Sequence, residues 1–265
     1  MSQWLFAAYP TFFTISPLVK FYVFLFQESR IILLFHDPCA IIYFMKWDIH
    51  QFETLESTNM TARACPPGTV VMAEMQTAGR GRYGRTWQSP KGNLYMSLVL
   101  PDLGKNTPYI AFLTAVAVAD SLPEFNVSLK WPNDVLLDGK KLAGILVERS
   151  VDKVIVGIGV NIISNPTENV LYPTTSLEGR LRPMTLAKRI LLQYNTLLEL
   201  LDKKGFKPIR ARWLAAAKGI GKPMTVHLAD SEASGIFKGI NATGALLLKE
   251  KHHTRKITVG DVFLI

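Results

Sequence analysis

The 265-residue sequence contains only two cysteines, Cys39 and Cys65, and their spacing matches no metal-ligand motif. This scarcity argues against a disulfide-stabilised scaffold and against a zinc site, so no metal-ligating residues are predicted. Few cysteines are typical of a reducing compartment, and we therefore expect a cytoplasmic protein. The sequence also lacks internal repeats and low-complexity tracts, which argues against a repeat architecture.

Residues 1–45 contain no glycine and are unusually rich in aromatic side chains. The longest uncharged stretch is interrupted by Pro10 and Pro17, which makes it a poor transmembrane helix. The basic start and the small-residue cleavage site of a signal peptide are also missing. We interpret residues 1–44 as an apolar, aromatic-rich extension outside the fold, translated upstream of a natural start at Met45. A membrane-associated or targeting segment and a packed structural piece are the alternatives.

The net charge of +9 is confined to one part of the chain. Residues 1–45 hold two basic and two acidic residues, so the whole excess lies in residues 46–265. A basic domain favours anionic partners such as nucleic acid, phosphates or an acidic protein. No membrane association is expected for this part of the chain.

The pattern after Met45 indicates two domains with a boundary near residues 219–222. Residues 45–219 alternate strand-like and helical stretches, including an amphipathic helix over 185–204 with one apolar face. Thr107-Pro108 predicts a helix start, and Asp138-Gly139 predicts a tight hairpin. Residues 220–265 contain closely spaced short strands, which is typical of a small barrel.

The stretch AGRGRYGRTW, residues 78–87, combines three glycines with three arginines. It fits the dinucleotide fingerprint GxGxxG and nearly fits a P-loop, but both devices require a helix after the glycines. Pro90 and Gly92 would stop such a helix within two turns. The stretch is therefore predicted to be a long strand–loop–strand connection with a functional role. The two nucleotide motifs and a plain surface loop remain as alternatives.

A lysine stands at the end of another predicted strand, which runs from Val127 and continues into Lys130-Trp131-Pro132-Asn133-Asp134. Pro132 ends the strand, so Lys130 and Asn133 are held near its terminus. A partly desolvated lysine among arginines suits an anion of high charge, such as a nucleoside triphosphate. A solvated charge at the strand end is the plain alternative.

Two further stretches offer neutral polar groups. Ser57-Thr58-Asn59 and Gln76 provide hydroxyls and amides that suit a polar, uncharged ligand group, although the first three also fit a simple helix cap. The glycines of the run over 157–162 predict a close approach to the backbone, and Asn161 on the same strand could read a base edge. A buried strand with a capping Asn161 would explain that run as well.

Together these motifs resemble biotin protein ligase in order and in spacing. The resemblance covers roughly residues 45–265, and it is most specific in the combination of the arginine-rich loop with the Lys-Trp-Pro-Asn-Asp motif. The motifs that carry it are Glu56-Ser57-Thr58-Asn59, the run Gln76 to Trp87, the run Lys130 to Asp134, Lys141-Leu142-Ala143-Gly144-Ile145-Leu146-Val147-Glu148, and Gly157-Ile158-Gly159-Val160-Asn161.

The resemblance implies an α+β fold, with a mixed β-sheet and helices in a class II synthetase-like catalytic domain of the biotin/lipoate ligase type. A small SH3-like barrel follows. The implied enzyme uses ATP and Mg²⁺ to convert biotin to biotinyl-5′-adenylate. It then transfers biotin to one lysine of the biotin carboxyl carrier domain of acetyl-CoA carboxylase.

The resemblance also implies roles for individual residues. The catalytic residues would be Lys130 and Arg82, with Lys130 contacting the biotin carboxylate and the α-phosphate. The biotin-binding residues would be Ser57, Thr58, Asn59, Gln76, Arg80, Gly81, Arg82, Lys130 and Gly144. The residues binding ATP or the adenylate would be Arg82, Arg85, Trp87, Asn133 and Asn161.

Other functions are weighed against this one. A lipoate or octanoate protein ligase shares the catalytic fold. A nucleic-acid-binding protein is suggested by the pI near 9.5 and by the basic run over 249–256, which a solvated hairpin tip explains equally well. Residues 1–45 show no helix-turn-helix pattern, so we expect a monofunctional ligase that binds no operator DNA. A monomer and a homodimer both fit the sequence.

Overall fold

The computed structural model describes residues 21–26, 30–35, 45–168, 170–228 and 230–264. The chain divides into two compact units, residues 1–43 and residues 44–265, and each is described by itself. In the first unit, strand β1 (Phe21–Phe26) pairs with strand β2 (Arg30–Phe35) in antiparallel register. The remainder of the extension lies outside the described residues, so its proposed origin stays a prediction.

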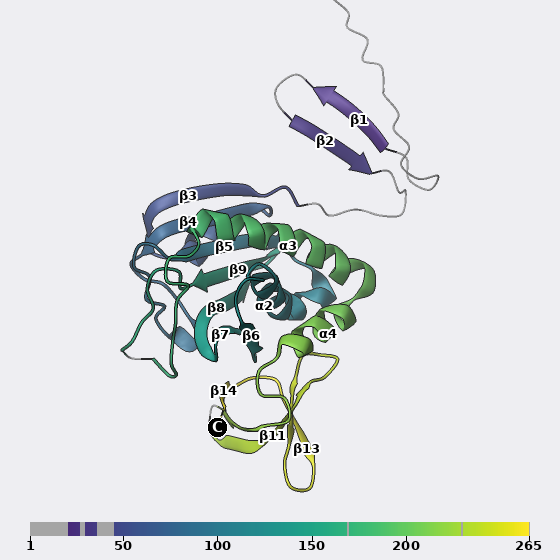
Figure 1. The fold of residues 1–265 in the computed structure, drawn as a ribbon. Coiled ribbons are helices and arrows are strands. Elements are labelled where there is room, and N and C mark those ends of the chain that lie inside the picture. The colour runs from purple at the N-terminus through teal and green to yellow at the C-terminus, as the bar shows by residue number, and fades with distance from the viewer. Residues whose placement is uncertain (1–20, 27–29, 36–44, 169, 229, 265) are drawn as a thin grey trace, which may run out of the picture. The chain divides into compact units, whose positions relative to one another are not determined.

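The second unit is built on a seven-stranded mixed sheet with the order β3-β4-β5-β9-β8-β7-β6 (Figure 1). Strands β3 and β4 are parallel, and the other neighbours are antiparallel. The strands are β3 (Asp48–Leu55), β4 (Thr69–Gln76), β5 (Leu94–Pro101), β6 (Val127–Lys130), β7 (Asp134–Leu137), β8 (Lys140–Arg149) and β9 (Lys153–Val160). This architecture confirms the predicted mixed sheet.

In the part of the chain that the structure describes, four helices and two 3₁₀ turns accompany the sheet. They are α1 (Thr58–Ala62), η1 (Arg82–Gly84), η2 (Gly104–Tyr109), α2 (Ile110–Asp120), α3 (Pro183–Lys204) and α4 (Phe206–Ala216). The predicted helix start at Thr107-Pro108 was wrong by a few residues. Pro108 lies in η2, and the Thr107 hydroxyl donates to Asp102 Oδ1 at 2.9 Å instead of capping α2. Among the described residues, no helix is long and apolar enough to cross a membrane.

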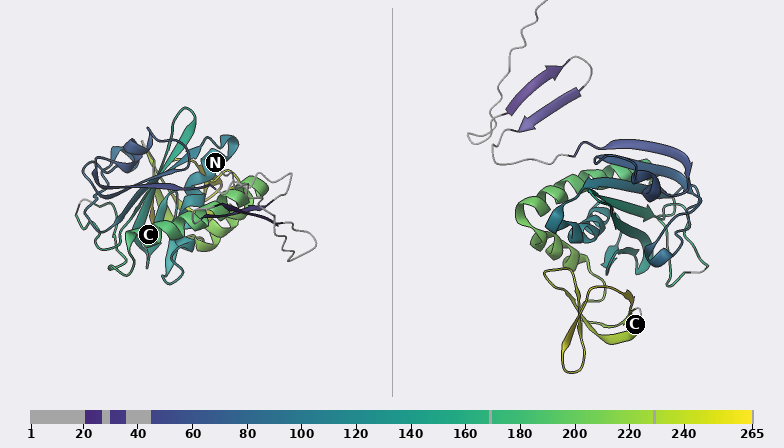
Figure 2. Two further views of the ribbon diagram at one scale, coloured as in Figure 1. Left: turned by 90° about the horizontal axis from the view of Figure 1, so that it is seen from above. Right: turned by 180° about the vertical axis from the view of Figure 1, so that it is seen from behind.

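The two faces of the large sheet differ in what covers them (Figure 2). Helices α2, α3 and α4 pack together against one face, where Val70, Met96 and Ile158 belong to the main hydrophobic core. Because side chains alternate along a strand, the intervening residues point to the opposite face. Among the described residues, a small apolar cluster forms there, in which Val71 packs with Ala62 of α1. The rest of that face is left open for a site.

A second, five-stranded antiparallel sheet follows α4 (Figure 1). Its order is β13-β12-β11-β10-β14, with β10 (Pro223–His227), β11 (Glu232–Ile240), β12 (Leu246–Lys249), β13 (Thr254–Ile257) and β14 (Asp261–Leu264). Strand β14 returns to pair with β10, which joins Asp261–Leu264 to this sheet. The arrangement agrees with the predicted SH3-like domain.

Candidate active site

A cavity of about 520 Å³ lies on the face of the large sheet that is not covered by α2, α3 and α4. A line of cross-strand neighbours crosses its floor, since Tyr95 pairs with Gly159, Gly159 with Gly144, and Gly144 with Asp134. All four residues line the cavity. The register of four neighbouring strands therefore sets the spacing of the groups on this floor.

The two glycines at the centre of this line leave room for the indole of Trp87. A Cβ atom at Gly159 would lie 2.6 Å from Trp87 Cε2, and one at Gly144 would lie 2.9 Å from Trp87 Cζ3. The predicted close approach to the glycines of β9 is thus made by a side chain of the arginine-rich loop. The Trp87 Nε1 atom is buried and has no hydrogen-bond partner among the described residues.

One end of the cavity carries a network of neutral polar groups. Gln76 Oε1 accepts a hydrogen bond from the Thr58 amide at 2.8 Å, and its Nε2 donates to Ser89 Oγ at 2.9 Å. The buried Ser97 hydroxyl lies 2.6 Å from Asn59 Oδ1 and 2.8 Å from Thr58 Oγ1. A side chain at position 157 would collide with Asn59, because a Cβ there would lie 2.3 Å from Asn59 Oδ1. These side chains are themselves uncharged and are held in fixed directions, and Asn59 Nδ2 also donates to the Glu148 carboxylate at 2.8 Å.

Helix α1 does not support the simple capping interpretation of this stretch. Ser57 occupies the N-cap position but makes no side-chain capping hydrogen bond. Ser57, Thr58 and Asn59 are all buried, and all three line the cavity. All three residues therefore belong to the wall of the cavity, and Ser57 does not cap the helix with its side chain.

The arginine-rich loop joins β4 to β5 and contains only the short turn η1. No helix follows its glycines, so the dinucleotide and P-loop interpretations were wrong. The loop is closed on itself by the bridge between Arg80 and Thr86, and the Trp87 amide donates to Gly79 O at 2.9 Å. The loop is thus a narrow hairpin, and its three arginines line the cavity.

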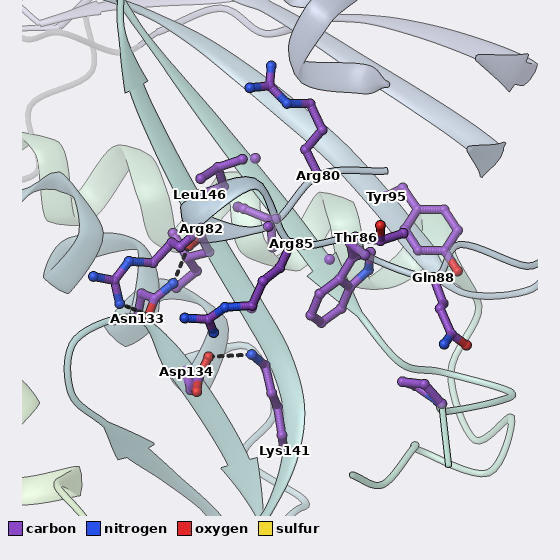
Figure 3. A pocket seen from close by; sticks show the side chains of 18 of the residues that line it. Arg80, Arg82, Arg85, Thr86, Gln88, Tyr95, Asn133, Asp134, Lys141 and Leu146 are labelled. Carbon is purple, nitrogen blue, oxygen red and sulfur yellow. Dashed lines mark hydrogen bonds and ion pairs between the residues drawn. The ribbon is translucent and has the colours of Figure 1, made fainter. Parts of the chain in front are cut away.

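Two carboxylates hold these arginines in place. Arg80 lies 3.5 Å from Glu148 Oε1, whereas Arg85 forms an ion pair with Asp261 of the C-terminal sheet. Arg82 Nη1 is 3.5 Å from Asp261 Oδ1 and donates to Asn133 Oδ1 at 3.4 Å. Arg85 accordingly extends toward Asp134 and Lys141, while Arg80 extends away from them (Figure 3).

The lysine in the wall of the cavity is Lys141 and not Lys130. Lys141 Nζ lies 2.7 Å from Asp134 Oδ1 and 5.4 Å from the centre of the Trp87 ring. Lys130 belongs to the same face through its pairing with Asp134, yet it does not line the cavity, and its side chain is 7% exposed. The aromatic ring of Tyr172 covers it, with Lys130 Nζ 3.4 Å from the ring centre. The position of Lys130 therefore gives no support to direct contact with substrate.

Burial and neighbouring charges shift the pKa values of Lys130 and Asp134 in opposite directions. Burial lowers the pKa of Lys130 to about 8, although the carboxylate of Asp134 pulls it upward. Burial alone would raise the pKa of Asp134, but the ammonium groups of Lys141 and Lys130 outweigh it and hold that pKa below its usual value. Burial, followed by the charge of Asp134, raises the pKa of Tyr172, so its hydroxyl stays protonated.

The cavity brings together most of the residues that the sequence singled out. They are Ser57, Thr58, Asn59, Gln76, Arg80, Gly81, Arg82, Arg85, Trp87, Asn133, Gly144 and Asn161. Sequence reasoning gave no role to Lys141, which stands just after the Asp138-Gly139 hairpin, although its motif was recognised. It also missed Tyr172 and Asp261, because no local pattern places either residue near the arginine-rich loop.

The fold and the site define the class of biotin and lipoate protein ligases. Residues 46–162 match the model of the biotin/lipoate A/B protein ligase family, and residues 219–265 match that of the biotin protein ligase C-terminal domain. The chain belongs to the biotin protein ligase family. It is 37% identical over 232 residues to the biotin–[acetyl-CoA-carboxylase] ligase of Paracoccus denitrificans, covering 78% of this chain and 97% of that protein.

Other relatives agree with this assignment. The bifunctional ligase/repressor BirA of Bacillus subtilis is 34% identical over 235 residues, which cover 80% of this chain and 72% of that protein. The biotin protein ligase of Aquifex aeolicus, solved in complex with biotin and ATP, superposes with a TM-score of 0.74 at 26% identity. That match covers 82% of this chain and 99% of the Aquifex chain.

Proposed function

We propose that this protein activates biotin with ATP to biotinyl-5′-adenylate, releasing pyrophosphate. It then transfers biotin to a specific lysine of the biotin carboxyl carrier domain of acetyl-CoA carboxylase. The observation that carries the proposal is the convergence of Arg82, Arg85 and Lys141 on one cavity that also contains a neutral polar end. The family relationship to a biotin–[acetyl-CoA-carboxylase] ligase supports the choice of substrates.

The chemistry explains why cations are needed here. A carboxylate must attack the α-phosphate of a polyanion, so both reactants are negative. Cations fixed in advance offset this repulsion and stabilise the charge of the transition state. Lys141 can do so from the cavity wall, and Asp134 holds its ammonium group in place at 2.7 Å. We therefore assign to Lys141 the contact with the carboxylate and the α-phosphate that the sequence assigned to Lys130.

The neutral end of the cavity suits the ureido ring of biotin. Thr58, Asn59 and Gln76 already belong to a hydrogen-bonded network, so their remaining donors and acceptors are held in fixed directions. Fixed polar groups of this kind discriminate well between a ligand that can pair with them and one that cannot. Arg80, Gly81 and Arg82 would close over biotin and the adenylate from the loop above.

Asn161 and Trp87 are assigned to the adenine end. Asn161 Nδ2 donates to Thr175 O at 3.0 Å, while its Oδ1 atom is buried and has no partner among the described residues. An acceptor without a partner in a cavity wall suits the exocyclic amine of adenine. The Trp87 indole offers the flat surface on which a base can stack.

Mg²⁺ is assigned to the phosphates of ATP. Among the described residues, no group of three or more His, Cys, Asp or Glu side chains could hold a metal ion. The cavity wall does contain Asp134 and Asp261, and magnesium is commonly bound by one or two carboxylates together with substrate phosphates. The ion would neutralise phosphate charge when bound. Asp134 and Asp261 are the residues that could hold it, and their present partners are Lys141 and Tyr172 for the first and Arg85 for the second.

We further propose a cytoplasmic ligase that binds no operator DNA, as a monomer or a homodimer. Only two cysteines in 265 residues support a reducing compartment. The basic run over 249–256 forms the hairpin of β12 and β13, in which Glu250 pairs with His253 and Arg255. A gel-shift titration on random DNA and RNA tests this part, and salt-sensitive binding would contradict it.

The direct test is mass spectrometry of the protein mixed with ATP, Mg²⁺ and biotin. We expect a peak for biotinyl-5′-adenylate, and none when ATP is omitted. Parallel mixtures with lipoate and with octanoate address the second activity of the wider family, and we expect no acyl-adenylate from either. Adenylate formed from lipoate but not from biotin would overturn the proposed function.

A further inference from the structure

Tyr172 occupies a fixed place beside the reacting end of the cavity. It lies on the connection between β9 and α3, where the Lys141 amide donates to Pro173 O at 2.9 Å and the Thr175 amide donates to Lys141 O at 2.9 Å. These two bonds extend β8 by a short parallel bridge between Lys141 and Thr174. The backbone of this segment is therefore anchored next to Lys141, and Tyr172 cannot be regarded as a freely moving loop side chain.

The hydroxyl of Tyr172 joins the pair formed by Asp134 and Lys141. It donates to Asp134 Oδ2, while the Lys141 ammonium group forms an ion pair with Asp134 Oδ1 at 2.7 Å. Lys141 Nζ is also 3.5 Å from the Tyr172 hydroxyl oxygen. Each oxygen of the Asp134 carboxylate thus has its own partner, and the two partners lie side by side.

The ring of Tyr172 has a different neighbour, the ammonium group of Lys130. Lys130 Nζ lies 3.4 Å from the ring centre, within the range of a cation–π contact, and 4.0 Å from Asp134 Oδ2. Phe263 of the C-terminal sheet packs edge-on against Tyr172, with 6.2 Å between the ring centres. The tyrosine ring therefore stands between the cavity and a buried lysine.

We propose that Tyr172 is a positioning residue with two separable tasks. Its ring covers Lys130 and keeps that ammonium group out of the cavity. Its hydroxyl occupies Asp134 Oδ2, so that the carboxylate directs Lys141 and not Lys130 toward the substrates. The second task rests on the proposed function, since it concerns adenylate formation at Lys141, whereas the first does not.

The physical reason is competition for one carboxylate. Lys130 and Lys141 both lie close to Asp134, and a buried carboxylate binds the better placed cation more strongly. With Oδ2 already taken by the Tyr172 hydroxyl, Lys130 stays at 4.0 Å, beyond hydrogen-bond distance. Without that hydroxyl, Lys130 could move onto Oδ2 and weaken the hold of Asp134 on Lys141.

The covering task is tested by amine labelling of the full-length protein without substrates. Acetic anhydride at pH 8 is the probe, and peptide mass spectrometry reads the labelling of Lys130 against that of the exposed Lys105. The pKa of Lys130 is about 8, so much of it is neutral at this pH, and weak labelling would reflect its cover and not its charge.

Two variants separate the ring from the hydroxyl. In Tyr172→Leu the aromatic cover is lost, and we expect labelling of Lys130 to rise by roughly tenfold, because the reagent would reach the amine without local unfolding of the protein. In Tyr172→Phe the ring remains, and Lys130 should stay as protected as in the wild type. Equal labelling of Lys130 in all three proteins would overturn the covering role, whatever reaction the protein catalyses.

The hydroxyl is tested by the rate of adenylate formation in Tyr172→Phe. We expect kcat to fall about tenfold, the typical effect of losing one hydrogen bond to an ion, with a smaller change in KM for biotin. Tyr109→Phe is the matched control, because Tyr109 stacks on Phe206 outside the cavity, and its kcat should not change. A Tyr172→Phe variant with the kcat of the wild type would overturn this role, whereas a wild-type protein that makes no adenylate would refute the proposed function and leave the labelling result standing.

Discussion

At the scale of single residues, one carboxylate organises the charges of the site. Asp134 stays ionised because two ammonium groups and a tyrosine hydroxyl offset its burial. Its carboxylate holds Lys141 at the cavity wall, with 2.7 Å between Asp134 Oδ1 and Lys141 Nζ. The neighbouring cation Lys130 stabilises the same carboxylate from behind the Tyr172 ring. Of the two lysines, Lys141 therefore lines the cavity, and Lys130 lies behind the Tyr172 ring and close to the carboxylate that holds Lys141.

Replacing Lys141 by methionine should abolish most of the adenylation activity. Loss of a cation aimed at the developing charge is expected to lower the rate by about 10²–10³-fold. The measurement is pyrophosphate release with saturating biotin and ATP. Lys105→Met, which removes an exposed lysine outside the cavity, serves as the control and should keep full activity. A Lys141→Met variant within a factor of two of the wild type would refute the assignment.

The titration of Lys130 predicts that the rate of adenylate formation depends on pH. Lys130 is charged below a pKa of about 8 and neutral above it, so adenylate formation should slow as the pH rises through that value. The charged or titratable groups that face it are Asp134, Lys141, Asp261, Arg85 and Tyr172. In Lys130→Met the slowing near this pH should vanish, and single-turnover rates from about pH 6 to 10 would show it. If the rate of adenylate formation fell equally with rising pH in the wild type and in Lys130→Met, the pH dependence would belong to another group.

At the scale of elements, the arginine-rich loop depends on one glycine for its shape. Gly79 lies under the loop, where a Cβ atom would be 2.3 Å from Trp87 O and 2.6 Å from Ser89 Oγ. At Gly81 the nearest contact of a Cβ atom would be 3.4 Å, to Arg85 O. The two glycines belong to the same loop, but a Cβ atom would clash with backbone at Gly79 and would fit at Gly81.

Gly79→Ala should therefore impair adenylate formation far more than Gly81→Ala. A displacement of the loop by about an ångström is expected to cost roughly 10²-fold in rate, because the arginines would miss the reacting groups. Thermal melting of both variants would show whether the effect is confined to the loop, and we expect similar midpoints. Equal losses of activity in the two variants would mean that the loop tolerates the shift at Gly79.

At the scale of the whole molecule, the small C-terminal sheet contributes to the wall of the cavity. Asp261, the first residue of β14, pairs with Arg85 and lies near Arg82. The arginine-rich loop is thereby tied to a second domain before any ligand enters. Anionic substrates would then compete with Asp261 for the same guanidinium groups.

Asp261→Asn should loosen the loop in the free protein. The pair is partly exposed, so its loss is expected to cost only about 1 kcal/mol of stability. The loop itself should respond more clearly, and limited digestion with trypsin should cut faster after Arg82 and Arg85. Asp202→Asn, at an exposed position of α3, is the control and should leave the cleavage rate unchanged. Unchanged cleavage in Asp261→Asn would show that this contact does not restrain the loop.

The sequence by itself determined the strand–loop–strand character of the arginine-rich segment, the hairpin at Asp138-Gly139 and the apolar face of α3. Proline, glycine and apolar periodicity act over a few residues, so local patterns suffice for such features. Only the tertiary structure decided which lysine lines the cavity. Lys130 and Lys141 both belong to recognisable motifs. The residue that covers Lys130 is Tyr172, and the residue that restrains the arginine-rich loop is Asp261. Both lie far along the chain from these motifs. Burial by distant residues leaves no mark on the local sequence, because it arises only when the sheet, the connection after β9 and the C-terminal domain meet.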